Sequence, residues 1–477
     1  MSRAYGMGLL VLFIFGAFTG CGDEANNGKG DDSATDDASV STETGMGTDS
    51  VTEGATDTNG TADSAVPAST DSATHADIAT DDQPPALPVR CSAHTTARKL
   101  SGAGSGTLPS LSGDNGSMMA AFTYDTKESG ASPQMQLGYF DAENSSWLTV
   151  FPFDDSVTSS SATLASYDGA RALVWVDART EWDADCTPDR PSACSGDVAF
   201  VTVTDGQIDQ PMPVRTSLGG GIVGTPAVVA TATGWVVTWV NNDNGNTTVW
   251  SAMVASDGSV SAPVNISGEY RATQNPALTM ATLNDTVLVM WGAYHQQAIF
   301  YAMLDSHGLP LGSVLTLAEG TTVFAPRVTA GHTSFLVSYG ARRSRDIAES
   351  ATIFTRMIDA TGQPLTAPTR ITWTDTAVTE SFPAYRSDMG NAIVWLSAKA
   401  NGSLKCVDSV CMTKVFASIL DDTGALASEP VLLSEGATDL NPCAAVTLNA
   451  TSDTWFVAYE IRRNLRQQIL YSTFTCE

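Results

Sequence analysis

The sequence predicts an all-β fold: a seven-bladed β-propeller of four-stranded antiparallel blades, preceded by a disordered linker. The first supporting observation is a unit of four short strands between 225 and 267, which contains the hairpin signal Asp257-Gly258. The second is that similar units follow one another along the chain. The third is physical, since four antiparallel strands cannot bury both faces of their sheet without copies of themselves. We therefore expect the units to pack around a ring.

An aromatic residue near the end of each second strand sets the number of blades. Seven such residues align: Tyr124, Trp175, Trp239, Trp291, Tyr339, Trp395 and Tyr459. A proline precedes most of them and is expected to start the unit: Pro109, Pro226, Pro276, Pro326, Pro383 and Pro442. The loops between second and third strands vary in length, which is typical of functional loops on a constant scaffold.

The two ends of the chain are expected to close the ring. The seventh unit stops at Glu477 after its third strand, and Thr96–Ser101 precedes the first unit as a fourth strand would. An N-terminal strand that completes the last blade removes the exposed sheet edges. Cys91 and Cys476 should then lie close together, so we expect a disulfide that clasps the ring.

The remaining cysteines are expected to brace loops. Cys186 and Cys194 lie in one long loop, and Cys406 and Cys411 in another, so each pair is a disulfide candidate. A metal site is the alternative for the second pair, although no histidine is near it. Cys443 is left over and is expected to be free and buried near the channel.

Composition excludes one class of partner. The 477 residues include 52 acidic and 24 basic side chains, for a net charge of −28. A nucleic-acid-binding protein needs a basic surface, so we expect no nucleic-acid partner. Eight cysteines together with a secretion signal indicate an oxidising compartment.

The N-terminus has the pattern of a secretion signal. The apolar stretch Gly8–Phe18 follows Arg3 and is shorter than the about 20 residues of a membrane span, which is typical of a signal peptide. It ends in Phe18-Thr19-Gly20-Cys21, which resembles the lipobox of bacterial lipoproteins, although that family prefers leucine where Phe18 stands. The resemblance implies a signal peptide over 1–20, lipidation of Cys21 and a bacterial envelope location, with Gly22 favouring the outer membrane. The alternative is an ordinary signal peptide cut nearby, with Cys21 incidental.

Residues 21–89 are expected to be a tether that precedes the propeller of 90–477. Fifteen acidic residues, one lysine and no Phe, Trp or Tyr occupy 22–89. Such a segment cannot bury enough apolar surface to offset chain entropy, so we expect a disordered spacer between the membrane and the propeller. The alternative is that its acidic run binds calcium or a partner.

The repeat resembles the units of seven-bladed propellers in bacterial secreted and surface proteins, which often read V-x-W-x-D-x-R and then D-x-x-G. Val174-Trp175-Val176-Asp177-Ala178-Arg179 resembles the first part with one residue fewer, and Asp359-Ala360-Thr361-Gly362 matches the second. The turn is also similar to the Asp-box of sialidase propellers, but the Ser and Trp of that motif are missing from nearly every copy. The resemblance implies a fold and assigns no activity.

Catalytic and metal signals are weak. No common hydrolase, zinc-protease or phosphate-binding motif occurs. A sialidase-type site would need three arginines and a tyrosine, for which Arg327, Arg386 and Tyr385 are the candidates. We expect no metal site, because the four histidines of the folded region fall at different heights: His94, His295, His307 and His332. No cofactor is expected; the alternative is calcium at 241–246, whose oxygen side chains alternate but lack a distal glutamate.

One cationic group contrasts with this acidic chain. The loops after the second strands of blades 5, 6 and 7 contain an arginine-rich set: Arg342, Arg343, Arg345, Arg462, Arg463 and Arg466, with Lys399 and Lys405. Adjacent blades should place these loops on one rim, where arginines can bind carboxylate or phosphate. Solvated arginines paired with neighbouring acids are the alternative.

These observations predict a membrane-anchored, monomeric binding or scaffolding module for an anionic glycan or an acidic protein partner. The alternative is a carbohydrate-active enzyme, a sialidase-like hydrolase or lyase, at the channel mouth, although an enzyme is the less favoured reading. A third reading is a purely structural envelope protein.

Overall fold

The structure is a computed structural model, and its description covers most of the chain from Val89 onward. The described ranges are 89–93, 98–100, 105–114, 117–125, 134–141, 146–150, 160–167, 169–177, 197–204, 207–209, 211–214, 221–243, 245–272, 278–293, 297–320, 322–342, 351–372, 376–387, 389–399, 406–407, 410–411, 413–434, 446–450, 454–463 and 466–477. All regular elements in these ranges are strands, and none of the ranges contains a helix that could cross a membrane.

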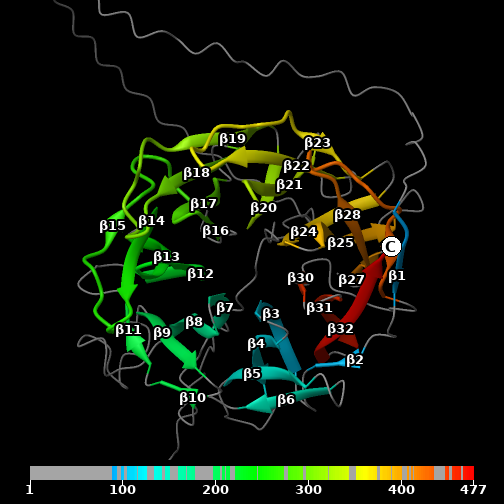
Figure 1. Ribbon diagram of the computed structural model, residues 1–477, viewed down its shortest axis with the longest axis horizontal. Helices are drawn as coiled ribbons and strands as arrows, with labels where there is room; N and C mark the ends of the chain where they lie inside the picture. The colour runs from blue at the N-terminus through cyan, green and yellow to red at the C-terminus, as the bar shows by residue number, and fades with distance from the viewer. Residues whose placement is uncertain are drawn as a thin grey trace, which may run out of the picture. The chain divides into compact units, whose positions relative to one another are not determined.

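The strands form seven antiparallel blades arranged in a ring (Figure 1). Blades 1 to 3 contain β3 (Ser105–Asp114), β4 (Ser117–Asp125), β5 (Gln134–Asp141) and β6 (Ser146–Val150); β7 (Ser160–Tyr167), β8 (Ala170–Asp177), β9 (Asp197–Thr204), β10 (Gln207–Ile208) and β11 (Met212–Pro213); and β12 (Gly221–Thr231), β13 (Gly234–Asp243), β14 (Asn246–Ala255) and β15 (Val264–Asn265).

Blades 4 to 6 contain β16 (Thr279–Leu283), β17 (Thr286–Ala293), β18 (Ala298–Leu304) and β19 (Leu315–Glu319); β20 (Thr322–Ala330), β21 (Ser334–Arg342), β22 (Thr352–Asp359) and β23 (Thr369–Arg370); and β24 (Thr376–Arg386), β25 (Gly390–Lys399), β28 (Thr413–Leu420) and β29 (Val431–Leu432). Blade 7 contains β30 (Val446–Ala450), β31 (Trp455–Arg463) and β32 (Arg466–Cys476), with β1 (Cys91–Ala93) and β2 (Arg98–Lys99) at its outer edge. The predicted fold class is confirmed.

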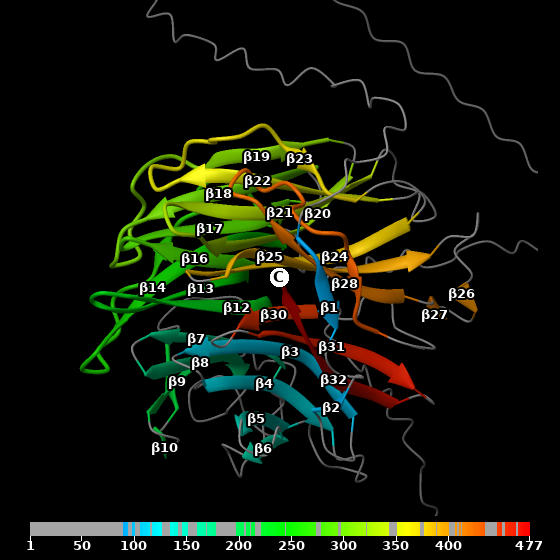
Figure 2. The same ribbon diagram turned by 45° about the vertical axis from the view of Figure 1, so that its right-hand side comes forward.

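Blades 1 to 6 run outward from the centre of the ring in chain order, and blade 7 does so up to β32, outside which β1 and β2 lie (Figures 1 and 2). The first strands of the blades lie innermost, and those of neighbouring blades contact one another. Blade 6 carries an additional hairpin, β26 (Cys406–Val407) and β27 (Val410–Cys411), which projects beyond β28 (Figure 2). Constant blades with a variable second-to-third connection therefore match the expected division between scaffold and loops.

The core lies between neighbouring blades rather than within one of them. Second strands are buried on both faces, as in Ser334–Gly340 of β21, because a blade packs against a neighbour on each side. The aligned aromatics Trp175, Trp239, Trp291 and Tyr459 are fully buried there. Burial raises the pKa of Tyr459 to about 12, so this phenol remains neutral in the core. In blade 1 the fully buried aromatic of β4 is Phe122, two residues before Tyr124.

Four of the six prolines lie inside a first strand rather than at its start, as the sequence suggested, and three of them interrupt it; Pro276 and Pro442 lie outside the described residues. Pro109, Pro226 and Pro326 each lie where the register of an inner strand shifts against its second strand. Proline has no N–H group for the ladder and is therefore tolerated at a bulge. Ala325, which precedes Pro326, has a positive φ of 48° at the same irregularity. In these blades the inner strand begins several residues before its proline. The additional residues extend along the channel to the rim at which the second strand ends.

Four-residue turns join third and fourth strands at the corners of blades 4, 5 and 6. In blade 5, Asp359 Oδ1 accepts hydrogen bonds from the amides of Thr361 and Gln363, both at 2.8 Å. The N–H of Gly362 donates to the Asp359 carbonyl, and Gly362 adopts the left-handed φ of 88°. Burial opposes ionisation of Asp359, but hydrogen bonds from Thr361 and Gln363 hold the pKa of its carboxyl below the usual value. Asp305 and Asp421 accept the same pair of amide bonds in blades 4 and 6.

These corner turns also fasten neighbouring blades together. A hydroxyl on the third strand of the preceding blade donates to the carbonyl of the turn glycine, through Ser251 to Gly308, Tyr301 to Gly362 and Thr355 to Gly424. In blade 6 the equivalent third-strand residue is Ala417, which faces Val394 as Thr355 faces Ser338. Ala417 has no hydroxyl, and the next blade has no such turn to receive one.

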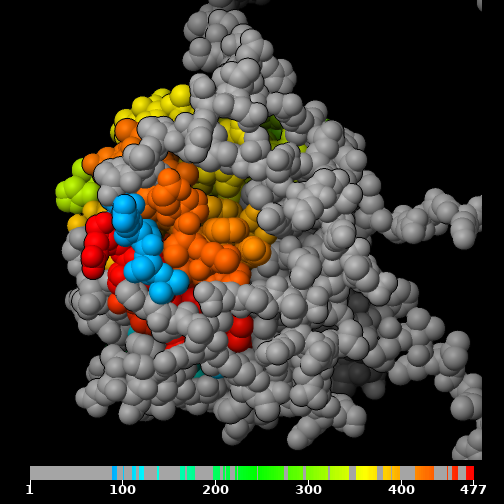
Figure 3. Space-filling view, turned by 90° about the vertical axis from the view of Figure 1, so that its right-hand side faces the viewer, coloured from blue at the N-terminus to red at the C-terminus, as the bar shows by residue number. Residues whose placement is uncertain are grey.

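The N-terminal strand completes blade 7, as the sequence predicted. β1 pairs with the end of β32 and β2 with its middle, so β32 receives its outer neighbour from the other end of the chain. Leu100 follows β2 and is only 4% exposed, in the core between blades 7 and 1. The segment also contacts blade 6, where Val89 N donates to the Ala427 carbonyl at 3.3 Å. Figure 3 shows this short N-terminal stretch beside strands from the C-terminal part of the chain.

A disulfide occupies the place where blade 7 would otherwise have its corner turn. Cys91 and Cys476 are register partners and are bonded across a separation of 385 residues. Next to them, Arg90 and Glu477 exchange two backbone hydrogen bonds, of 3.1 and 2.9 Å. The predicted clasp therefore joins two strands from opposite ends of the chain at the point where a turn joins consecutive strands in blades 4, 5 and 6.

Candidate functional site

The seam between blades 5 and 6, at the inner end of the sheets, brings charged and aromatic side chains together. Five residues form it and are called here the seam site: Phe324, Arg327, Arg342, Glu380 and Phe382. β20 and β21 supply the first three, and β24 supplies the other two. The bulged inner strands place them, because the register shift lets each strand extend from the channel to the rim.

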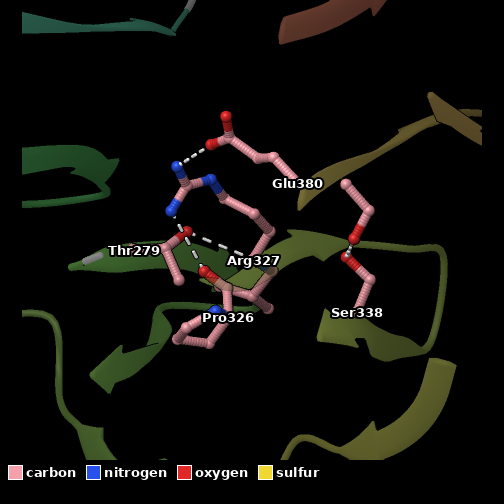
Figure 4. Close-up of polar contacts among 7 residues, drawn as sticks. Thr279, Pro326, Arg327, Ser338 and Glu380 are labelled. Carbon is pink, nitrogen blue, oxygen red and sulfur yellow. Dashed lines mark hydrogen bonds and ion pairs between the residues drawn. The ribbon is translucent and has the colours of Figure 1, made fainter. Parts of the chain in front are cut away.

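Arg327 and Glu380 form an ion pair from one blade to the next (Figure 4). Their side chains are 16% and 13% exposed, so the pair is partly withdrawn from water. Nη1 of Arg327 also donates to the Pro326 carbonyl at 3.2 Å, and Cζ lies 5.9 Å from the centre of the Phe382 ring. The chain's own carboxylate therefore neutralises this guanidinium, and the pair ties two blades together at the channel.

Hydroxyl contacts flank the ion pair on both sides (Figure 4). Ser381 donates to Ser338 at 3.0 Å between β24 and β21, and both side chains are buried. On the other side the amide of Val328 donates to Thr279 Oγ1 of blade 4, at 3.4 Å. Such polar contacts between strands of neighbouring blades link blades 4, 5 and 6 around Arg327.

Phe324 and Arg342 lie nearer the rim than Arg327. Phe324 is the register partner of Gly340, and Arg327 that of Ser338, so both lie on one face of blade 5. The Arg342 guanidinium carbon lies 4.7 Å from the centre of the Phe324 ring. Arg342 is the last residue of β21, immediately before the long second-to-third connection of blade 5. This arginine is therefore packed on an aromatic ring at the base of a loop.

The structure places the other predicted arginines only in part. Arg462 and Arg463 end β31, and Arg466 begins β32, where Arg463 and Arg466 are direct register partners. Lys399 ends β25 in the same way. Second strands of neighbouring blades end on the same rim, so these positions lie on the rim that carries Arg342. Arg343, Arg345 and Lys405 lie outside the described residues.

The residues considered for a sialidase-type site are not brought together. Tyr385 and Arg386 pair with Asn391 and Gly390 at the hairpin between β24 and β25, the opposite end of β24 from Glu380. Arg327 lies in the middle of β20 and is bonded to Glu380. The two arginines therefore lie at different levels of the inner strands and are not brought together around one carboxylate.

The segment considered for calcium is the hairpin between β13 and β14. Asn241 to Asp243 end one strand and Asn246 begins the next, so successive side chains point to opposite faces of the sheet. Asn242 Oδ1 accepts the Gly245 amide at 2.8 Å and thereby serves the turn. In the described ranges, no group of three His, Cys, Asp or Glu is placed to hold a metal ion.

The remaining cysteines are described only in part. Cys406 and Cys411 are register partners across the β26–β27 hairpin, the backbone arrangement that a disulfide between them requires. Cys21, Cys186, Cys194 and Cys443 lie outside the described residues.

Sequence reasoning missed Phe324, Glu380 and Phe382. Phe324 and Glu380 lie beside register shifts of inner strands, and Phe382 lies two residues beyond one; the sequence shows only a proline nearby, Pro326 or Pro383. A bulge changes which side chains share a face, so strand alternation read from the sequence could not place them.

Solved structures resemble this chain only remotely. The sialidase of Trypanosoma rangeli in complex with sialic acid aligns with a TM-score of 0.39 and 10% identity, over 81% of this chain and 59% of its own length. The β-propeller domain of the Trilobed protease from Pyrococcus furiosus aligns with a TM-score of 0.42 and 8% identity, over 77% of this chain and 95% of its own. CoXyl43, a GH43 β-xylosidase/α-arabinofuranosidase from a compost microbial metagenome, aligns with a TM-score of 0.35 and 12% identity, over 57% of this chain and 97% of its own length.

No protein-family model matches the sequence, and no curated protein matches it. At identities this low a likeness concerns the fold alone. Function must therefore be argued from the residues of this chain.

Proposed function

We propose that the protein is a membrane-anchored, extracytoplasmic binding or scaffolding module whose ligand is anionic and binds the rim of blades 5, 6 and 7. The observation that carries the proposal is the register pair Arg463–Arg466, two arginine positions directly opposite each other at the end of one hairpin. Like charges in this arrangement destabilise a hairpin. An anion bound at these positions would offset that repulsion, which supports an anionic ligand.

Two further cationic positions extend the rim. Arg342 ends the second strand of blade 5, and Lys399 ends that of blade 6. They stand on a chain whose net charge is −28, so a local cationic group is not a consequence of composition. Guanidinium groups present planar pairs of donors that fit carboxylate or phosphate oxygens. The ligand class is an acidic glycan or the acidic surface of a partner protein.

The membrane anchor is a lipid on Cys21, and residues 22–89 form the spacer that separates it from the propeller. The lipobox-like run before Cys21 supports this, as does the acidic, aromatic-free composition of the spacer. The location is the bacterial envelope, at the outer membrane. Metabolic labelling with palmitate tests the anchor: the wild-type chain should be labelled and the Cys21→Ser chain should not. Equal labelling of both would refute it.

A binding array of acidic and neutral glycans, run on the full chain in detergent at low and physiological salt, tests the ligand class. We expect acidic hits that weaken as salt rises, because exposed charges are screened. The double variant R463S/R466S should lose most of this binding. Arg271→Ser is the matched control, since Arg271 is an exposed arginine of a different blade.

Absence of any acidic hit at either salt would contradict the proposal. Unchanged binding by R463S/R466S would place the ligand elsewhere on the molecule. Turnover of a glycan on the array would favour the enzyme alternative instead.

A further inference from the structure

We propose that the disulfide Cys91–Cys476 carries tension from the membrane anchor directly into β32, so that the short strands that close the ring are not loaded. This mechanical role goes beyond stabilisation of the closed ring. It rests on the proposed function, because an anchor at Cys21 and a ligand held at the rim would pull on the molecule from two ends. Mechanical handles can apply that pull without lipid or ligand, so the role of the disulfide is testable separately from the anchor and the ligand class.

β32 connects the two places at which the molecule would be pulled. Its first residue, Arg466, lies at the rim opposite Arg463, in the hairpin to which we assign the anionic ligand. Its last residue, Cys476, lies at the opposite end of the strand, where the described chain begins at Val89 and continues into β1 (Figure 1). With the disulfide in place, a pull between ligand and anchor therefore runs along one strand, from one end of the blade to the other.

The strands that close the ring have few hydrogen bonds with which to resist such a pull. β1 pairs with β32 over three register pairs, and β2 pairs with it over two. Two backbone bonds join Arg90 to Glu477, and one joins Val89 to Ala427. Each bond contributes only about 1 kcal/mol net, so tension would break these bonds in order from the tether end. Leu100, which is buried in the core between blades 7 and 1, would follow, and the ring would open.

The disulfide transfers the tension to a much longer ladder. Through Cys476 the pull reaches β32, which pairs with β31 over nine register pairs, from Trp455–Phe474 to Arg463–Arg466. Trp455 and Phe474 are fully buried, and their rings stack with centres 6.2 Å apart. A long hairpin with a buried aromatic pair beside the disulfide therefore takes the tension in place of the short edge strands.

The position of the disulfide is better explained by tension than by stability alone. Lys99 and Leu470 are also register partners next to a backbone-bonded pair, as Cys91 and Cys476 are. A disulfide there would close a loop of nearly the same length, and loop-closure entropy varies only with the logarithm of that length. It would stabilise the closed ring by a similar amount, but tension would still separate β1 from β32. The actual disulfide lies at the tether end, where only two described residues precede it.

The test stretches the full chain in an optical trap. One handle is attached at Gly22, at the start of the tether, and the other through an azide-bearing residue at Asn246, which is exposed on the β13–β14 hairpin at the rim. We expect the oxidised wild type to show no extension step below the force that unfolds its blades. C91S/C476S, and the wild type in reductant, should release the twelve residues 89–100 at lower force, an extension of roughly 40 Å.

The matched control moves the disulfide within the same edge. The variant C91S/C476S/K99C/L470C should regain most of the thermal stability that C91S/C476S loses. It should nevertheless release residues 89–98 at low force, an extension of roughly 35 Å. Thermal unfolding of each variant without reductant shows that the variant is folded and separates a loss of stability from a loss of mechanical resistance.

The outcomes decide between the two roles. An early step of the same size and force in oxidised wild type and in C91S/C476S would overturn the mechanical role. Suppression of that step by the moved disulfide, as complete as by the natural one, would also overturn it and leave ring stability as the explanation. Failure of palmitate labelling at Cys21 would overturn the proposed anchor without changing the result in the trap, so the two failures can be told apart.

Discussion

Two kinds of corner hold the outer strands of this propeller, and they solve the same problem differently. In blades 4, 5 and 6 the chain is continuous, and an aspartate with a glycine three residues later shapes the turn from third to fourth strand. In blade 7 the chain is interrupted, and the disulfide Cys91–Cys476 joins the strands instead. The comparison teaches that a corner needs a covalent link between adjacent strands. The link is the continuous backbone in one case and a disulfide in the other.

The neighbouring blades respond to the type of corner. Ser251, Tyr301 and Thr355 donate to the turn glycine of the following blade, while Ala417 stands where the following blade has no turn. A hydroxyl is thus present where the following blade has a turn carbonyl to accept its hydrogen bond. It is absent where the disulfide takes the place of that turn. Removing a corner should therefore have an effect that depends on which kind it is.

The largest effect is expected from breaking the disulfide corner. The double variant C91S/C476S removes a link across 385 residues, and loss of a native disulfide destabilises a protein by about 2–5 kcal/mol. Denaturant unfolding of the full chain without reductant measures this. The matched control is C406S/C411S, register partners whose link would close a much shorter loop and should matter less. Equal stability of C91S/C476S and wild type would mean that β2 and Leu100 alone close the ring.

An intermediate effect is expected from glycines of the turn corners, and it sharpens the comparison within that class. Gly362 has a φ of 88°, and a Cβ there would lie 2.8 Å from Met303 Cγ of the preceding blade. Gly258 closes the corresponding turn of blade 3, where Ala255 stands in the place of the aspartate; it has a φ of 82°, but a Cβ there would meet open space. G362A should lower the free energy of unfolding by about 2–3 kcal/mol, and G258A by about 1 kcal/mol. A similar loss in both variants would show that backbone conformation, not blade packing, sets the requirement.

The smallest effect is expected from the charge of a corner aspartate and depends on pH. The pKa of Asp359 is lowered in the folded protein from its ordinary 3.8, so its charged form stabilises the turn above that pH. This contribution, about 1 kcal/mol or less, is lost as pH falls through the folded pKa. Melting temperatures of wild type and D359N between pH 2.5 and 7 should converge at the acid end. A difference that stays constant across this range would exclude a role for the charge.

The sequence determined the architecture of this protein. The aromatics at the ends of second strands, such as Trp239 and Trp291, gave seven blades because each unit must bury such a residue against its neighbour. The position of Cys91 relative to the repeat and of Cys476 at the end of the last one predicted the clasp, since both follow from counting strands. Hydrophobic alternation and repeat spacing are local properties, so they can be read without coordinates.

Only the tertiary structure decided which side chains of neighbouring blades lie in contact. Pro326 and its neighbours shift the register of β20, which puts Phe324 and Arg327 on one face and carries Arg327 to Glu380 of the next blade. The same register gives Phe324 its place over Gly340 and under Arg342. Strand periodicity cannot foresee a bulge, and contacts between blades join residues far apart in the chain, such as Arg327 and Glu380, which are 53 positions apart. The physical reason is that burial patterns specify each strand, whereas the seam between two blades is specified only when both are packed.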